Sequence, residues 1–246
     1  MITPKPKDAL HKAQLYRLLI ELLDDPYIAS HVYFKGGTCA AMLGFLDRFS
    51  IDLDFDLKKG AAREIVHTRL LALFTKLQLQ VQQKSETSLF YVLKYNASKN
   101  ERNSLKLSIM EEVVGANSYE LAYLSEIDRY AQCQTIATMF ANKLVALTDR
   151  YDKNSTIAGR DVYDIHHFFL QGYSYNQAVI TERTGQKSVD YLHKLVKFIE
   201  ENITDEIITQ DLNVLVPTQQ FQLVRKVLKR ETTMFLNDEI TRLERN

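Results

Sequence analysis

The alternation of apolar and polar positions is most regular over residues 51–57, which read IDLDFDL. Side chains of a strand point alternately to its two faces, so this pattern predicts a strand with one apolar face. The other face would carry Asp52, Asp54 and Asp56. Carboxylates side by side repel each other unless a cation lies among them, and the ordinary cation for oxygen ligands is a hard divalent ion. We therefore expect a divalent metal at this strand.

A glycine turn precedes the aspartates. Residues 31–34 predict a short strand and residues 38–45 a helix, with Gly36 and Gly37 between them. Glycines allow the backbone to approach a ligand closely, and the free N–H groups at a helix start favour an anion such as phosphate. A lone Gly-Gly pair is more often only a turn. Followed by a metal-binding Asp-x-Asp strand, however, it outlines a site for phosphoryl transfer.

The remaining periodicity predicts an α+β protein. Alternation indicates further strands at residues 79–83, 88–95 and 104–110, all in the first half of the chain. Apolar residues at helical spacing indicate helices at residues 8–23, 60–79, 135–151, 160–170, 175–183, 189–201 and 219–237. We expect a domain with a mixed sheet flanked by helices over residues 1–130, followed by a helical bundle over residues 131–246.

Composition narrows the class of protein. Apolar residues make up 46 % and charged residues 25 % of the 246 residues, which fits a soluble globular protein. Two cysteines, Cys39 and Cys133, supply no disulfide framework or zinc spacing. The first residues lack the apolar stretch of a signal peptide, and no run is long enough to span a membrane. We expect a cytoplasmic protein with no membrane partner.

Charge is balanced overall but uneven locally. Lys plus Arg equals Asp plus Glu at 31 each. Residues 58–110 nevertheless hold ten Lys or Arg against three acids, an excess of seven positive charges. Such a segment could bind RNA phosphates or could simply be solvated.

Other candidates each have a structural alternative. Arg48 and Ser50 could bind nucleotide phosphates or stabilise a turn. Lys143 lies in an otherwise apolar helix and could extend to the surface. Asp161 and Asp164 are three residues apart on one helical face, where they could form ion pairs with Arg150 and Arg160.

Taken together, these motifs resemble the AbiEii and MenT type of nucleotidyltransferase toxins, in the polymerase-beta-like nucleotidyltransferase superfamily. The resemblance spans roughly residues 30–170. The motifs that carry it are Gly36-Gly37-Thr38, Arg48-x-Ser50-x-Asp52-x-Asp54-Phe55, Lys143-Leu144-x-Ala146-Leu147 and Arg160-Asp161-x-x-Asp164. The first two are common among nucleotidyltransferases, and the last two indicate this family.

The resemblance implies a Mg²⁺-dependent enzyme that moves a nucleoside monophosphate from an NTP to an acceptor. It implies tRNA or another RNA as acceptor, a toxin of a toxin–antitoxin or abortive-infection system, and a separate antitoxin. Its catalytic residues would be Asp52, Asp54, Lys143 and Asp161, the first two of which would bind the metal. The residues that bind the nucleotide would be Lys35, Gly36, Gly37, Thr38, Arg48, Ser50 and Arg160. The active site would lie between the two domains.

One position departs from the superfamily. Many members carry a third carboxylate on the strand beside the Asp-x-Asp strand, and the matching residue here is Ser108. Asp56 or Glu111 could replace it, or two carboxylates could suffice. Two other functions stay open: nucleotide transfer to a small molecule or a protein, and a non-catalytic binding protein that retains the fold.

Overall fold

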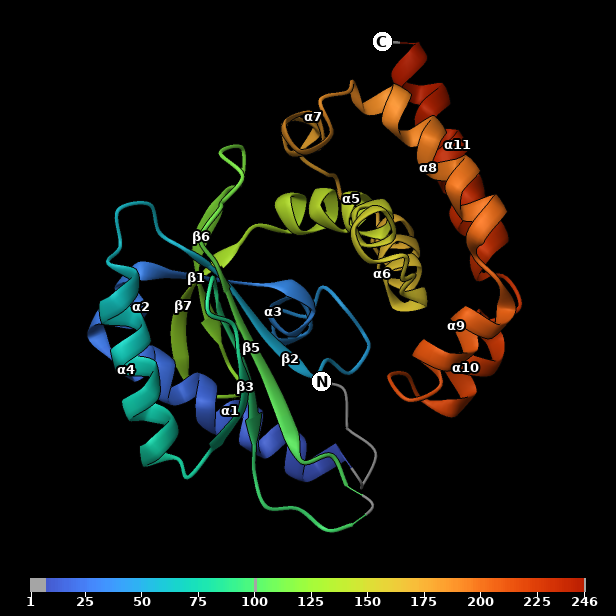
Figure 1. Ribbon diagram of the computed structural model, residues 1–246. Coiled ribbons are helices and arrows are strands. Elements are labelled where there is room, and N and C mark those ends of the chain that lie inside the picture. Colours follow the sequence, from blue (N-terminus) through green and yellow to red (C-terminus); the bar gives the residue numbers. More distant parts are fainter. Residues whose placement is uncertain (1–7, 100, 246) are drawn as a thin grey trace. The chain divides into compact units, whose positions relative to one another are not determined.

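The computed structural model describes residues 8–99 and 101–245. Its contacts divide the chain into two compact units, each described by itself below (Figure 1). The sheet unit comprises residues 1–113 and 118–135, and the helical unit comprises residues 114–117 and 136–246. The predicted boundary at residue 130 falls inside a strand, whereas the units divide after Thr135.

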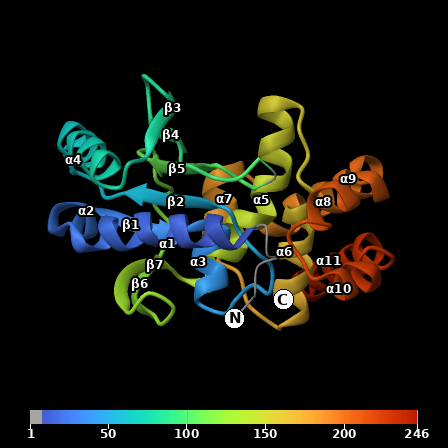
Figure 2. The same ribbon diagram turned by 90° about the horizontal axis from the view of Figure 1, so that it is seen from below.

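The sheet unit is built on one mixed sheet with the strand order β3-β4-β5-β2-β1-β7-β6. Figure 2 shows this order from β3 at the top to β6 at the bottom. Strand β2 is antiparallel to β1 and parallel to β5, and β1 is parallel to β7. The strands are β1 (Val32–Lys35), β2 (Asp52–Leu57), β3 (Gln80–Lys84), β4 (Leu89–Lys94), β5 (Ser104–Met110), β6 (Tyr119–Leu124) and β7 (Arg129–Gln134).

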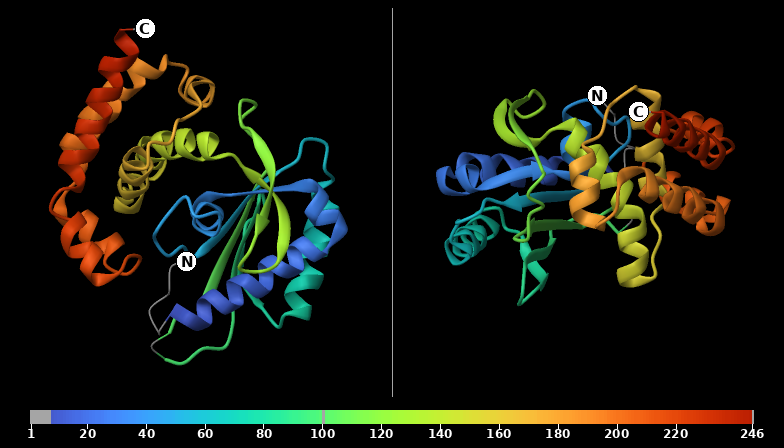
Figure 3. Two further views of the ribbon diagram at one scale, coloured as in Figure 1. Left: turned by 180° about the vertical axis from the view of Figure 1, so that it is seen from behind. Right: turned by 90° about the horizontal axis from the view of Figure 1, so that it is seen from above.

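Helices cover one face of this sheet. Helix α1 (Ala9–Asp24) packs on the central strands and α4 (Arg63–Lys76) on β3 and β4, and the two helices contact each other (Figure 3). Leu53, Phe55 and Leu107 are fully buried beneath them. Two short helices, α2 (Pro26–His31) and α3 (Gly36–Met42), flank β1 in the chain. The sequence prediction for β2 is confirmed, because its apolar residues face the helices.

The opposite face of the sheet, here called the polar face, carries the aspartates. Register places Lys106 beside Asp52, Ser108 beside Asp54, and Tyr33 beside Asp56. Paired residues in a sheet point to the same side, so these side chains share one face. The polar face also extends over β7 and β6, two strands that the sequence analysis did not predict. Strand β6 is largely exposed and its burial does not follow period two, whereas β7 buries Ala131, Cys133 and Gln134 but only one of its buried residues, Cys133, is a strongly apolar type.

The helical unit contains seven helices among its described residues. They are α5 (Ile136–Asn154), α6 (Gly159–Leu170), α7 (Gln177–Thr184), α8 (Ser188–Asn202), α9 (Asp205–Leu212), α10 (Thr218–Val224) and α11 (Leu228–Glu244). Phe140, Leu144 and Phe168 are buried in its core. Helix α9 was not predicted, and residues 219–237 form parts of two helices rather than one. No helix in the described parts of either unit is long and apolar enough to cross a membrane.

Candidate active site

The glycine turn lies against the aspartate strand. Gly36 has a positive φ of 77°, which side chains disfavour, and it directly follows β1. A methyl group at Gly36 would lie 2.6 Å from Oδ2 of Asp54, closer than atoms can approach. Lys35 is also the register partner of Asp54. The fold therefore brings the first motif and the second together at the polar face.

The neighbouring glycine faces the two other predicted phosphate-binding side chains. A methyl group at Gly37 would lie 2.9 Å from Oγ of Ser50 and 3.0 Å from a guanidinium nitrogen of Arg48. Arg48 is 2 % exposed and donates a hydrogen bond to the carbonyl of Phe49 at 3.0 Å. A buried guanidinium beside a backbone that has no side chain is suited to an anion. Thr38 is used differently: its hydroxyl donates to the Asp52 carbonyl at 2.5 Å, which fixes the turn to β2.

The third aspartate of the strand has a protein cation as its partner. Asp56 is 2 % exposed, and Lys35 Nζ lies 2.5 Å from its Oδ1. The other oxygen of Asp56 accepts hydrogen bonds from the Tyr119 hydroxyl and the Gln134 amide, both at 2.8 Å. The three aspartates of β2 therefore fall into two groups. Lys35 neutralises Asp56, which leaves Asp52 and Asp54 as the candidates for an external cation.

These two carboxylates fit a magnesium ion. They alternate along β2 on the polar face, and Mg²⁺ is usually held by one or two carboxylates, with substrate phosphates and water completing its shell. Within the described part of the chain, no three His, Cys, Asp or Glu side chains form a group that could hold a metal by themselves. Register confirms that Ser108 stands at the position beside Asp54 where a third carboxylate would lie.

In the helical unit, the later motifs form a buried ion cluster between α5 and α6. Lys143 Nζ lies 2.9 Å from Asp161 Oδ1 and 2.8 Å from Asp164 Oδ2. Both carboxylates are fully buried, whereas the Lys143 side chain is 19 % exposed. Arg150 approaches the second oxygen of Asp161 at 3.3 Å. The lysine does not simply extend into solvent: two carboxylates from α6 fix its position.

Electrostatics keep the Asp161 carboxyl ionised. Burial by itself would raise the pKa of Asp161, but Lys143, Arg150 and Arg160 outweigh it and lower that pKa to about 2. Asp161 is therefore a carboxylate at neutral pH that is fully engaged with protein cations. Its contacts are those of a residue that positions Lys143. Arg160, the other predicted nucleotide-binding residue, acts on Asp161 through its charge.

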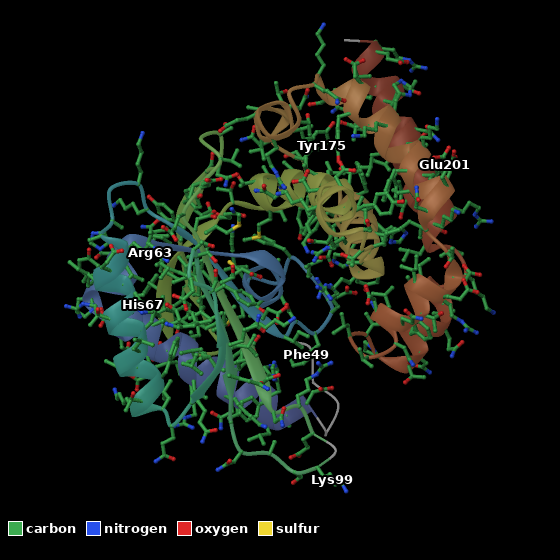
Figure 4. The ribbon with its side chains drawn as sticks, viewed as in Figure 1. Phe49, Arg63, His67, Lys99, Tyr175 and Glu201 are labelled. Atoms are coloured by element: carbon green, nitrogen blue, oxygen red, sulfur yellow. The ribbon has the colours of Figure 1, made fainter. Side chains whose placement is uncertain are left out.

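Several supporting residues were missed in the sequence. His11 Nε2 donates a hydrogen bond to the Ile51 carbonyl at 2.9 Å, since a carbonyl oxygen can only accept, and burial lowers the pKa of this imidazole. This hydrogen bond anchors the loop before β2, which contains Phe49 (Figure 4). Tyr119 and Gln134 anchor Asp56, as described above. None of these residues belongs to a motif, and each is distant from β2 in sequence, so no local pattern could identify it.

The contact at Gly36 gives a direct test of the site. Gly36→Ala should displace the Asp54 carboxylate and reduce any metal-dependent activity by about a hundredfold, the typical cost of misplacing a reacting group by 1 Å. Gly44→Ala is the matched control, because Gly44 has nearly the same φ of 79° and nothing within 4 Å of its added methyl group. Both variants carry the same backbone strain. If they lose activity equally in a turnover assay, the close approach to Asp54 has no role.

A mixed sheet that joins a Gly-Gly turn to an Asp-x-Asp strand defines a nucleotidyltransferase. The chain belongs to the family described as nucleotidyl transferase AbiEii toxin, of type IV toxin–antitoxin systems, whose model matches residues 17–230. The sequence-based assignment to this family is thereby confirmed. A comparison with curated protein sequences gives no match.

Solved structures share the fold. JHP933 from Helicobacter pylori is 18 % identical, with a TM-score of 0.55 over 98 % of each chain. MenT4, a nucleotidyltransferase toxin from Mycobacterium tuberculosis, is 18 % identical with a TM-score of 0.56, over 96 % of this chain and 87 % of that one. At this identity the likeness concerns the fold alone, and the predicted α+β architecture is confirmed.

Proposed function

We propose that this nucleotidyltransferase uses Mg²⁺ to move a nucleoside monophosphate from an NTP to tRNA, and that it acts in this way as a toxin. The observation that carries the proposal is the convergence of Gly36 on Asp54 and of Gly37 on Ser50 and Arg48. It joins an anion-binding corner to a carboxylate pair on one strand. The family description supports an antitoxin as a separate partner.

In the proposed reaction, a hydroxyl oxygen of the acceptor attacks the α-phosphorus of the NTP. The bond from that phosphorus to the bridging oxygen breaks, and pyrophosphate leaves. Asp52 and Asp54 would hold the metal, which offsets phosphate charge when bound. Gly36 and Gly37 would admit the phosphates close to the backbone, while Arg48 and Ser50 bind their oxygens.

Neither Asp56 nor Glu111, the two candidates for a third carboxylate, is well placed to take the proton. Asp56 is occupied by its three donors, as described above. Glu111 pairs with Arg63 at 3.1 Å and lies three residues beyond Ser108, or roughly 10 Å along the strand. Of the alternatives left by the sequence, we therefore favour a site in which two carboxylates suffice. The attacking hydroxyl would lose its proton to solvent or to the substrate phosphates.

In the helical unit, we assign Lys143 to the triphosphate. Its ammonium is held by Asp161 and Asp164, yet the side chain retains some exposure. A lysine fixed in this way can offset negative charge that develops on the departing phosphates without first reorganising. Asp161 is then a positioning residue that acts through Lys143.

The acceptor decides between this proposal and its rivals. The purified protein should be incubated with each labelled NTP, Mg²⁺ and total cellular RNA, and the products separated. Label in the tRNA fraction is the expected result. Label in a small molecule or in protein instead would favour another acceptor, and the absence of any transfer would favour a binding protein, for which Ser108 is the sequence argument.

The basic segment over residues 58–110 has fewer cations available to bind phosphates than its composition suggests. Within the described residues, five of its ten cations form ion pairs: Arg63, Arg69, Lys76, Lys84 and Arg102. Lys94 and Lys106 are exposed on the polar face and have no ion-pair partner in the described parts of the chain. Lys106 is also the register partner of Asp52. We propose that these two lysines bind acceptor phosphates.

Lys94→Glu with Lys106→Glu should therefore weaken tRNA binding and flatten its salt dependence by about 0.7 for each lost phosphate contact. Lys99→Glu reverses one charge at the outer end of the β4–β5 loop (Figure 4) and should have less than half the effect of the double variant. Affinity would be measured by titration at two salt concentrations. Equal slopes for the double variant and the native protein would exclude these lysines from the acceptor site.

A further inference from the structure

A groove at the β6 side of the sheet unit is not used by the reaction described above. It has a volume of about 450 Å³ and is formed by β1, β6 and β7, together with α2 and the residue after β2. Its aromatic walls are Tyr33 and Tyr130. Such a volume is in the range of ligand-binding sites.

Two residues that line the groove, Tyr130 and Leu121, are the most exposed large apolar side chains of the described sheet unit, and the exposed Tyr123 lies beside Tyr130. Tyr130 is 65 % exposed, Leu121 is 62 % exposed and Tyr123 is 48 % exposed. Tyr123 and Tyr130 are register partners whose ring centroids lie 5.1 Å apart. Large exposed apolar groups that cluster in this way mark an interaction surface. We call Leu121, Tyr123 and Tyr130 the tyrosine patch.

The tyrosine patch is continuous with the candidate active site. Tyr33 is the register partner of Asp56, and its ring stacks on Tyr119 with centroids 3.8 Å apart. The Tyr119 hydroxyl in turn binds Asp56. The groove lies about four residues along the chain from Asp54, at Lys58, and two strands across, at β7. The groove is therefore roughly 15 Å from Asp54. A stacked strand of about five nucleotides covers that distance.

The chemistry of the groove favours an anion that carries aromatic rings. Among the described residues that line the groove, Lys58 is the single charged side chain; beside the groove, the Tyr123 hydroxyl donates a hydrogen bond to the Asp128 carboxylate at 2.7 Å. Ser30 and Gln132 add a hydroxyl and an amide. Exposed rings beside a cation are the elements that bind single-stranded nucleic acid, because each base can stack while the phosphates meet positive charge.

We infer that the tyrosine patch and its groove bind unpaired nucleotides of the RNA acceptor by base stacking. This inference rests on the proposed function, since it gives that acceptor a second contact away from the reacting hydroxyl. It also gives a preference for single-stranded over duplex RNA, whose bases are already stacked in pairs. The edge strand β6 could instead pair with a second copy of the chain, which the test must distinguish.

The chain contains no tryptophan, so a single introduced one reports on the patch. Tyr130→Trp, in an Asp52→Asn background that prevents transfer, should lose fluorescence when titrated with a single-stranded RNA oligonucleotide and much less with its duplex. Val81→Trp is the control reporter, because Val81 is 39 % exposed and its register partner Leu93 is buried on the helix-covered face. Its fluorescence should not change.

Affinity gives the second readout. Tyr130→Ala should weaken single-stranded RNA binding by about 5- to 150-fold, the range that corresponds to losing one stacked base. Tyr130→Phe keeps the ring and should retain affinity. Quenching that is absent, equal with duplex, or produced by NTP alone would overturn the inference. A concentration-dependent dimer that buries the patch and is lost in Tyr130→Ala would overturn it in favour of a second copy.

The two proposals fail in different ways. If single-stranded RNA quenches Tyr130→Trp but the native protein labels no RNA, the proposed function is wrong and the binding surface stands. If RNA is labelled while Tyr130→Trp shows no quenching, the acceptor is bound elsewhere and the inference is wrong.

Discussion

Replacing Asp52 or Asp54 by Asn is expected to reduce nucleotide transfer by about a thousandfold while the sheet unit stays folded. Each substitution keeps the size of the side chain and removes the charge needed to bind a divalent ion. Both side chains are half-buried on the polar face, and the hydroxyl of Thr38 binds the backbone of Asp52, not its carboxylate. Polar changes of this kind usually cost little stability.

The measurement is transfer of label from an NTP, with thermal unfolding of each variant beside it. Glu86→Gln is the matched control: it makes the same change of charge on a side chain that is 81 % exposed and only weakly paired with Lys84. This control should keep full activity. An Asp52→Asn protein with native activity and native stability would remove the strand from the active site.

Asp56→Asn should behave differently from its neighbours on the same strand. It would remove the buried carboxylate that Lys35, Tyr119 and Gln134 all contact, and removing one partner of such a mostly buried ion pair is destabilising. A loss of activity in that variant would thus come with a loss of stability. The comparison separates the two carboxylates that face a ligand from the one that supports the fold.

Much of this organisation was predictable because it is local. The period-two pattern of residues 51–57 predicted both the strand and the buried positions of Leu53 and Phe55. Helical spacing likewise predicted α1, α5 and α6 to within three residues at each end. The motifs around Gly36 and Asp54 were predicted to meet, and the fold brings them into contact range.

The rest depended on residues far apart in the chain. The alternation that places Asp56 with Asp52 and Asp54 could not show that Lys35, Tyr119 and Gln134 converge on it. The local count of cations could not show that Arg69 and Arg102 pair with acids of the first 25 residues. Strands β6 and β7 were missed because their exposed tyrosines interrupt the apolar pattern. Those same tyrosines form the patch that we assign to RNA.

The ion pairs of Lys143 decide which substitution can test its role. Lys143→Ala would remove the ammonium that pairs with both buried carboxylates, Asp161 and Asp164, and breaking a buried ion pair costs about 3–5 kcal/mol. A protein that unfolds is not toxic, so relief of toxicity by this variant alone could not separate a catalytic role from a structural one. Lys143→Arg retains a cation for both carboxylates but replaces a compact ammonium by a planar guanidinium.

Expression of the native protein in a bacterial host is expected to slow growth, and Lys143→Arg is expected to relieve it. Purified Lys143→Arg should unfold near the native temperature yet transfer label about a hundredfold more slowly. The guanidinium would not occupy the position of the ammonium that offsets phosphate charge. Lys197→Ala, which removes a lysine that is 75 % exposed in the same unit, should slow growth as the native protein does. Growth curves, label transfer and thermal unfolding of all three variants decide the matter. If Lys143→Ala relieves toxicity while Lys143→Arg does not, the lysine serves only to neutralise Asp161 and Asp164, and the triphosphate must find its cation elsewhere.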